Sequence, residues 1–271
     1  MRCLPAPGLA EPQPVGRWAL RLEYDGGPFV GWQRQASGVS VQAVLEEAAT
    51  RLAGGVPLAV LAAGRTDAGV HAAAQVAQLD LPEALAARLS ADHLRDALNF
   101  HLKPHPVVVT AAAPAPAGWH ARFSAIGRAY AYRILNRPSR AALAAGRVWH
   151  VKRPLDASAM AEAAGLLLGR HDFTSFRAAA CQARSPVRTL DALVVRRSDD
   201  VIEIEAHARS FLHHQVRNMV GTLKLVGDGH WPASRVTEAL AARDRASAGP
   251  TAPAAGLCLV AVTYPQDPFA A

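Results

Sequence analysis

The chain has 271 residues, 51% of them hydrophobic, with a formal net charge of +7 and a sequence pI near 9.9. This composition excludes a disordered chain, and the length allows one large domain or two modest ones, each with a core. No apolar run is long enough to span a bilayer and no signal peptide opens the chain, so we expect a soluble, cytoplasmic protein.

The first half of the chain alternates strand and helix patterns. After a Pro- and Ala-rich opening, residues 1–15, which we expect to be a flexible tail, "WALRLEYDGG" predicts a half-buried strand that ends in a glycine turn. Ser40 is positioned to cap a helix over "SVQAVLEEAATRL". "PLAVLAA" and "AQVAQLDL" predict strands on either side of the loop "GRTDAG". A helix near residues 90–100 and a strand through "PVVVTAAA" complete this half.

A linker, "APAPAGW", separates two predicted halves, residues 16–115 and 116–271. The second half begins with a strand in "AIGRAYAYRILN" and a helix in "DASAMAEAAGLLLG", which Asp156 caps. "TLDALVVRR" and "VIEIEAHA" predict an antiparallel pair, "FLHHQVRNMVGTLKLVG" a long helix, and "LCLVAVTY" a last strand. Strands and helices in this mixed order predict an α+β protein with mainly antiparallel sheets.

The loop "AAGRTDAGVHA" contains a single acid, Asp67. Gly64 and Gly69 allow positive φ and a close approach of a ligand to the backbone. Arg65 is near in sequence, and a neighbouring cation favours the ionised carboxylate. Such a carboxylate can act as a nucleophile, a base or a metal ligand. A structural turn in which Asp67 caps backbone amides explains the local pattern equally well.

Two other chemistries are disfavoured. A metal site needs several ligands at workable spacing, but His71 stands alone, and His213 and His214 would point about 100° apart on the predicted helix. Zinc protease and zinc deaminase motifs are both missing from the sequence. Glycoside hydrolysis usually requires two carboxylates, and the next acid after Asp67 is Asp80. A lone acid suits a reaction that keeps its leaving group and activates no water.

The long predicted helix has an apolar stripe, with His213, Arg217, Gly221 and Lys224 on its other side. Arg217 could therefore reach a carboxylate in a cleft. The helical pattern alone favours a solvated basic face.

The sequence resembles the bacterial tRNA pseudouridine synthase A family, in motifs that run in order from about residue 17 to 265. These motifs are "YDGGPFVGWQRQ", "AGRTDAGVHA", "HARFSA", "RAYAYRI", "HDFTSFR", "FLHHQVRNMVGTL" and "GLCLVAVTYP". The resemblance implies two similar α/β-sandwich-like halves, their sheets joined around a basic central cleft. It also implies a homodimer that binds one tRNA, and neither a metal nor an organic cofactor.

The resemblance also implies roles for single residues. Asp67 would be the nucleophile that isomerises uridine to pseudouridine at positions 38, 39 and 40 of the anticodon stem-loop, by a ring or a ribose route. Tyr130 would stack on the flipped base and help remove the C5 proton, and Arg217 would pair with Asp67. Arg65 would extrude the base and contact the RNA.

Further contacts to the anticodon arm are implied in two segments. These contacts would involve His120, Arg122, Phe123, Gln182 and Arg184, and they would position the RNA through its backbone. Ala129 departs from the family pattern, which often has a second basic residue there. Two alternatives remain on the sequence: an RNA-binding module without catalysis, and a glycosidase that releases uracil.

Overall fold

The computed structural model describes residues 15–270. The strands are β1 (Val15–Tyr24), β2 (Val60–Ala62), β3 (His71–Pro82), β4 (Val107–Pro114), β5 (Gly127–Asn136), β6 (Trp149–Val151), β7 (Gly169–Asp172), β8 (Val187–Ser198), β9 (Val201–Ala208) and β10 (Leu257–Thr263). The α-helices are α1 (Val41–Leu52), α2 (Glu83–Ala86), α3 (Ala91–Leu102), α4 (Ala157–Gly165), α5 (Gln215–Gly227) and α6 (Ser234–Ala242). Short 3-10 helices are η1 (Thr174–Phe176), η2 (Arg245–Ser247) and η3 (Ala254–Gly256).

All ten strands belong to one sheet, in the order β4-β1-β3-β10-β5-β9-β8-β7, with β2 beside β3 and β6 beside β5. The pairs β10–β3 and β5–β6 are parallel, and the other pairs are antiparallel. The predicted α+β class with mainly antiparallel pairing is therefore confirmed. The expected tail, residues 1–15, lies outside the described residues except for Val15, which begins β1.

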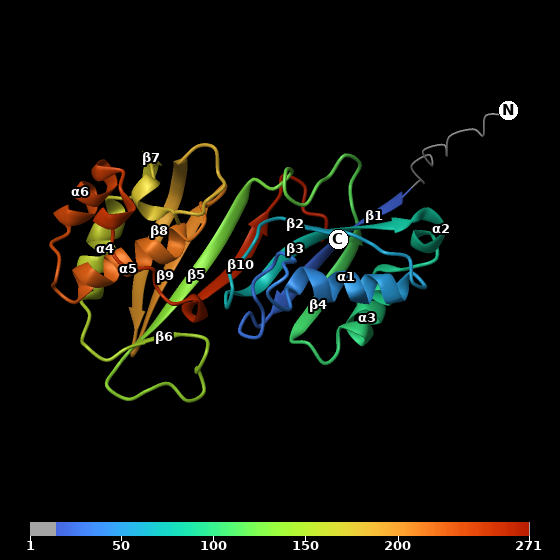
Figure 1. Cartoon of the computed structure of the whole chain (residues 1–271), viewed down its shortest axis with the longest axis horizontal. Helices are drawn as coiled ribbons and strands as arrows, with labels where there is room; N and C mark the ends of the chain where they lie inside the picture. The colour runs from blue at the N-terminus through green and yellow to red at the C-terminus, as the bar shows by residue number, and fades with distance from the viewer. Residues whose placement is uncertain (1–14, 271) are drawn as a thin grey trace, which may run out of the picture.

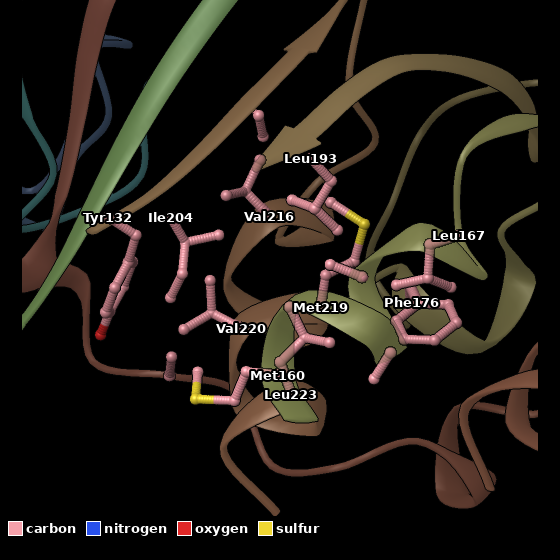
Figure 2. Close-up of a cluster of buried hydrophobic side chains, with 14 of the residues drawn as sticks. Tyr132, Met160, Leu167, Phe176, Leu193, Ile204, Val216, Met219, Val220 and Leu223 are labelled. Carbon is pink, nitrogen blue, oxygen red and sulfur yellow. The ribbon is translucent and has the colours of Figure 1, made fainter. Parts of the chain in front are cut away.

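Helices cover the sheet in two separate groups (Figure 1). One core cluster joins α1 and α3 to β1, β3 and β4, and a second joins α4 and α5 to β5, β8 and β9. Figure 2 shows the second cluster, in which side chains from the strands meet those of the helices. Its labelled members are Tyr132, Met160, Leu167, Phe176, Leu193, Ile204, Val216, Met219, Val220 and Leu223. Burial of these apolar side chains stabilises each helix on the sheet.

The last strand, β10, joins the two helix-covered parts of the sheet. It pairs with β3 through Cys258 and Leu259 on one side, and with β5 over most of its length on the other. Tyr130, in β5, packs against both core clusters and therefore lies at the seam between them. The candidate site forms at this seam.

The predicted helix caps explain two of the helix starts. The side chain of Ser40 accepts a hydrogen bond from Ala43 N, and Asp156 accepts bonds from the amides of Ser158 and Ala159. These bonds satisfy amide groups that have no partner within the helix. The predicted β8–β9 pair is also confirmed. The strand after the Asp67 loop begins at His71, three residues earlier than its apolar pattern predicts.

Candidate active site

Asp67 lies on a tight loop between β2 and β3, as predicted. The loop is fixed from several sides. The Tyr24 hydroxyl is 2.8 Å from Thr66 Oγ1, and Gln75 donates to Gly64 O at 2.8 Å. Trp32 N donates to Thr66 O at 3.0 Å. Both polar partners, Gln75 and Thr66, are buried. The loop therefore presents Asp67 from a rigid support, as a positioned catalytic group requires.

The segment "DGGPFVGW" packs directly under this loop. Gly31 has φ of +106°, and a Cβ there would lie 2.8 Å from Thr66 O and 3.1 Å from the Asp67 carbonyl carbon. Only glycine combines that conformation with so close an approach. The first motif of the family pattern thus supports the backbone of Asp67.

The Asp67 carboxylate faces three basic side chains from the start of α5 and the turn before it. Arg217 Nη1 donates to Asp67 Oδ2 at 3.2 Å. His213 Nε2 lies 3.4 Å from Oδ1, and His214 Nε2 lies 3.4 Å from Oδ2. The Asp67 side chain is 20% exposed, so it remains open to a substrate. Among the described residues, the cation that pairs with Asp67 is Arg217; Arg65 is exposed and forms no ion pair with it.

Arg217 is held in place on both sides. Its Nε donates to Ala252 O at 2.8 Å, and its own carbonyl accepts from Ala252 N at 3.1 Å. The solvated basic face favoured by the helical pattern is wrong: the Arg217 side chain is only 15% exposed, Gly221 is buried against Pro250, and Lys224 pairs with Asp228. Arg217 therefore contacts residues outside the helix, whereas Lys224 pairs with Asp228 at the C-terminal end of the same helix.

The predicted helical position of His213 and His214 is also wrong. Helix α5 begins at Gln215, and His214 has a left-handed conformation with φ of +63°. The Gln215 side chain accepts from Leu212 N at 2.8 Å and stabilises this turn. The two imidazole rings lie 4.1 Å apart, and both reach Asp67. The expected 100° divergence, which argued against a shared ligand, does not apply to this turn.

Asp67, His213 and His214 could each offer one ligand atom to a metal ion, because these atoms lie within 4.8 Å of one another. The Arg217 guanidinium, however, already contacts the same carboxylate and would repel a cation. Burial lowers the pKa of His214, and the charges of His213, Arg217 and Arg245 lower it further against the opposing effect of Asp67. The lowered pKa favours the neutral form of the His214 imidazole beside the ion pair of Asp67 and Arg217.

Tyr130 provides an aromatic surface at the seam. Its ring packs edge-on against Phe211, with centroids 5.3 Å apart and an interplanar angle of 86°. Burial raises the pKa of Tyr130 well above its usual range, and the charges of Tyr24 and Asp67 raise it further. The phenol is therefore neutral at physiological pH, and it can donate a hydrogen bond.

The other predicted contact residues lie on two connecting segments. Arg122 and Phe123 are exposed, Phe123 by 73%, while His120 accepts from the amides of both through Nδ1. Gln182 and Arg184 are exposed on the connection between η1 and β8. That connection is attached to the site, because Ala178 N donates to His213 O at 2.9 Å.

Sequence reasoning missed the direct contact of His213 and His214 with Asp67. Two adjacent histidines just before an amphipathic helix were the available signal. It also missed Gln75 and Arg128, buried or half-buried polar residues within strands.

Comparisons with known proteins agree on one family. The family model described as tRNA pseudouridine synthase matches residues 22–124 and 163–265. The chain is 70% identical over 255 residues to the tRNA pseudouridine synthase A of Acidiphilium cryptum, covering 93% of this chain and 98% of the relative. It is 55% identical to that of Gluconobacter oxydans over 96% of this chain and 94% of the relative. It is 62% identical to the tRNA pseudouridine synthase A of Rhodospirillum centenum, over 92% of this chain and 99% of the relative.

Proposed function

Since the chain belongs to the tRNA pseudouridine synthase family, we propose that it isomerises uridine to pseudouridine in tRNA with Asp67 as the nucleophile. The observation that carries the proposal is the position of this carboxylate. It is held on a rigid loop, remains 20% exposed, and is paired with Arg217 across 150 residues of sequence. Covalent catalysis by a carboxylate needs an acid that is rigidly positioned, accessible to the substrate and kept ionised by a neighbouring cation.

In the proposed reaction, the bond between uracil N1 and ribose C1′ breaks and a bond between C5 and C1′ forms. C5 loses its proton, and N1 gains one. Asp67 forms and later releases a covalent bond, through either the ring or the ribose. No water is consumed, which agrees with the single acid in the loop.

We assign Tyr130 to the flipped base. Its ring lies between the two cores and against Phe211, so it offers a fixed surface for stacking. Because its phenol is neutral, it would act as a hydrogen-bond donor or relay near C5 rather than as a preformed phenolate base.

The RNA contacts complete the proposal. Exposed basic and aromatic side chains suit backbone contacts and stacking on the anticodon arm, with positions 38, 39 and 40 as targets. The residues in this role are the exposed Arg65, Arg122, Phe123 and Arg184, together with the exposed amide of Gln182 and the half-buried His120. We further propose that the two halves, residues 16–115 and 116–271, bind the RNA between them, that the enzyme is a homodimer, and that it acts in the cytoplasm, where its substrate is. No helix among residues 15–270 is long and apolar enough to cross a membrane.

Tritium release from [5-³H]uridine-labelled tRNA tests the reaction, since attachment through C5 expels that hydrogen. Transcripts with a single uridine at position 38, 39 or 40 test the sites. We expect release by the wild type and none by Asp67→Asn, which should still bind tRNA. Asp92→Asn is the matched control, because Asp92 is 77% exposed on α3 and its ion-pair partner is the neighbouring Arg95. Release by Asp67→Asn at the wild-type rate, or free uracil as the product, would contradict the proposal.

A further inference from the structure

One side chain in β5 donates hydrogen bonds to four main-chain carbonyls in three separate segments. Arg128 Nη2 donates to Ala63 O at 2.6 Å and to Arg122 O at 3.0 Å. Its Nη1 donates to Arg209 O at 2.7 Å and to Ala125 O at 3.2 Å. The planar guanidinium, with its fixed fork of donors, is suited to hold several acceptors in one geometry.

Each of the three segments leads into part of the site. Ala63 immediately precedes the Asp67 loop. Arg122 and Ala125 lie in the connection that exposes Phe123. Arg209 follows β9 and precedes the turn with His213 and His214, which contact Asp67. The side chain of Arg128 therefore touches the supports of the nucleophile, of a predicted RNA contact and of the histidine turn.

Arg128 is not explained as an ordinary ion pair. Among the described residues, no carboxylate lies within ion-pair distance of it. Burial lowers its pKa, with the charges of Tyr264 and Tyr130 opposing and those of Arg122 and Arg209 adding to the effect. The four hydrogen bonds to carbonyls offset the cost of partly burying the guanidinium, and the carbonyl groups of all three segments must stay in place to supply them.

We propose that Arg128 is the positioning residue that aligns the Asp67 loop with the RNA-contacting segment and the histidine turn. The inference rests on the proposed function and deepens it, because it assigns the relative placement of nucleophile and substrate to one side chain outside the reacting groups. Loss of Arg128 should therefore impair both the chemical step and tRNA binding, although its hydrogen bonds go to main-chain carbonyls and not to the Asp67 carboxylate.

The test compares Arg128→Met and Arg128→Lys with Arg133→Met. Arg133 lies in the same strand, but its side chain is 61% exposed and pairs with Glu203 at the surface. Methionine keeps the bulk of the stem without donors, and lysine keeps the charge but has a single ammonium group. Three measurements are made: the single-turnover rate constant and amplitude of tritium release, the dissociation constant for tRNA, and hydrogen exchange of the full-length protein.

For Arg128→Met we expect the rate constant to fall about 100-fold, the loss associated with roughly 1 Å of misplacement. The dissociation constant should rise severalfold, and amides in residues 63–69, 121–126 and 209–214 should all exchange faster. Arg128→Lys should be intermediate in all three, and Arg133→Met should resemble the wild type.

A role in stability alone gives a different result: the amplitude falls with the folded fraction, while the rate constant and dissociation constant are unchanged. That result would overturn the inference. Faster exchange in only one of the three segments would also overturn it, as would failure of both Arg128 variants to fold. If the wild type released no tritium, the proposed function would fail, and the exchange measurement would still decide whether Arg128 aligns the three segments.

Discussion

Gly221→Ala should damage the site from a position that touches no substrate. Gly221 lies in α5, one turn after Arg217, and its α-carbon faces the segment that contains Pro250 and Ala252. A Cβ at Gly221 would lie 1.7 Å from Pro250 O and 2.9 Å from Pro250 C. The helix and this segment must therefore move apart by more than about 1 Å to restore an ordinary contact. The same segment binds Arg217 through Ala252.

The magnitude follows from two opposing effects. Overpacking against a backbone carbonyl costs up to about 3 kcal/mol, whereas alanine is better than glycine in a helix by about 1 kcal/mol. We expect a net loss of about 2 kcal/mol in the free energy of unfolding, or about 4–8 °C in Tm. Displacement of Arg217 from Asp67 should also lower turnover by about 100-fold.

Chemical denaturation and single-turnover tritium release measure the two effects. Gly165→Ala is the matched control, because Gly165 is the last residue of α4 and an added Cβ meets nothing within 4 Å. That control should be unchanged or slightly more stable, with full turnover. If Gly221→Ala kept both wild-type stability and wild-type turnover, the close packing of α5 on residues 249–252 would not be what holds Arg217 at Asp67.

Three further predictions concern pH and charge. Burial would raise the pKa of Asp228, but hydrogen bonds from Lys224 and His230 lower it overall. The Asp228 carboxylate therefore stabilises the fold above about pH 4, and this stabilisation is lost on acidification. Asp228→Asn should lower the free energy of unfolding, measured by urea denaturation at pH 7, by about 2 kcal/mol. The pKa of His214 is lowered by burial, so the free energy of unfolding should fall as pH drops below about 6.5, and His214→Gln should flatten that slope. All four tyrosines have raised pKa values, so ultraviolet titration should detect no native phenolate at pH 10, and stability should fall above that pH.

Each of these has a contrary outcome. Equal loss of stability for Asp228→Asn at pH 3 and pH 7 would show that the charge of Asp228 is not what stabilises. An unchanged slope in His214→Gln would assign the acid sensitivity to another group. Phenolate absorbance in the folded protein at pH 10 would show that water reaches at least one tyrosine ring.

Local signals in the sequence predicted most elements and the loop that contains Asp67. Ser40 and Asp156 are caps whose side chains bind nearby amides, so their effect is readable over three or four residues. The start of α5 was misplaced because its turn is stabilised by the Gln215 side chain and a left-handed His214, and neither is a standard capping signal.

The partners of Asp67 could not be predicted from local pattern. Arg65 is two residues away and faces solvent, while Arg217 is 150 residues away and makes the ion pair. Such pairing depends on how the sheet brings α5 to the Asp67 loop, and only the resemblance to the family indicated it. The four carbonyl groups that accept hydrogen bonds from Arg128 could not be predicted either, because every residue has a carbonyl group and the sequence does not distinguish these four.

The position of β10 has a consequence for synthesis on the ribosome. The strand that hydrogen-bonds both β3 and β5 is made last, so until then the nascent chain has two unfinished sheets with open edges at β3 and β5. Open edges invite wrong pairing with other chains. A chain that terminates before Leu257 would contain Asp67, Tyr130 and Arg217 and still lack the strand that links their sheets. We therefore expect a chain that is truncated before β10 to modify no uridine.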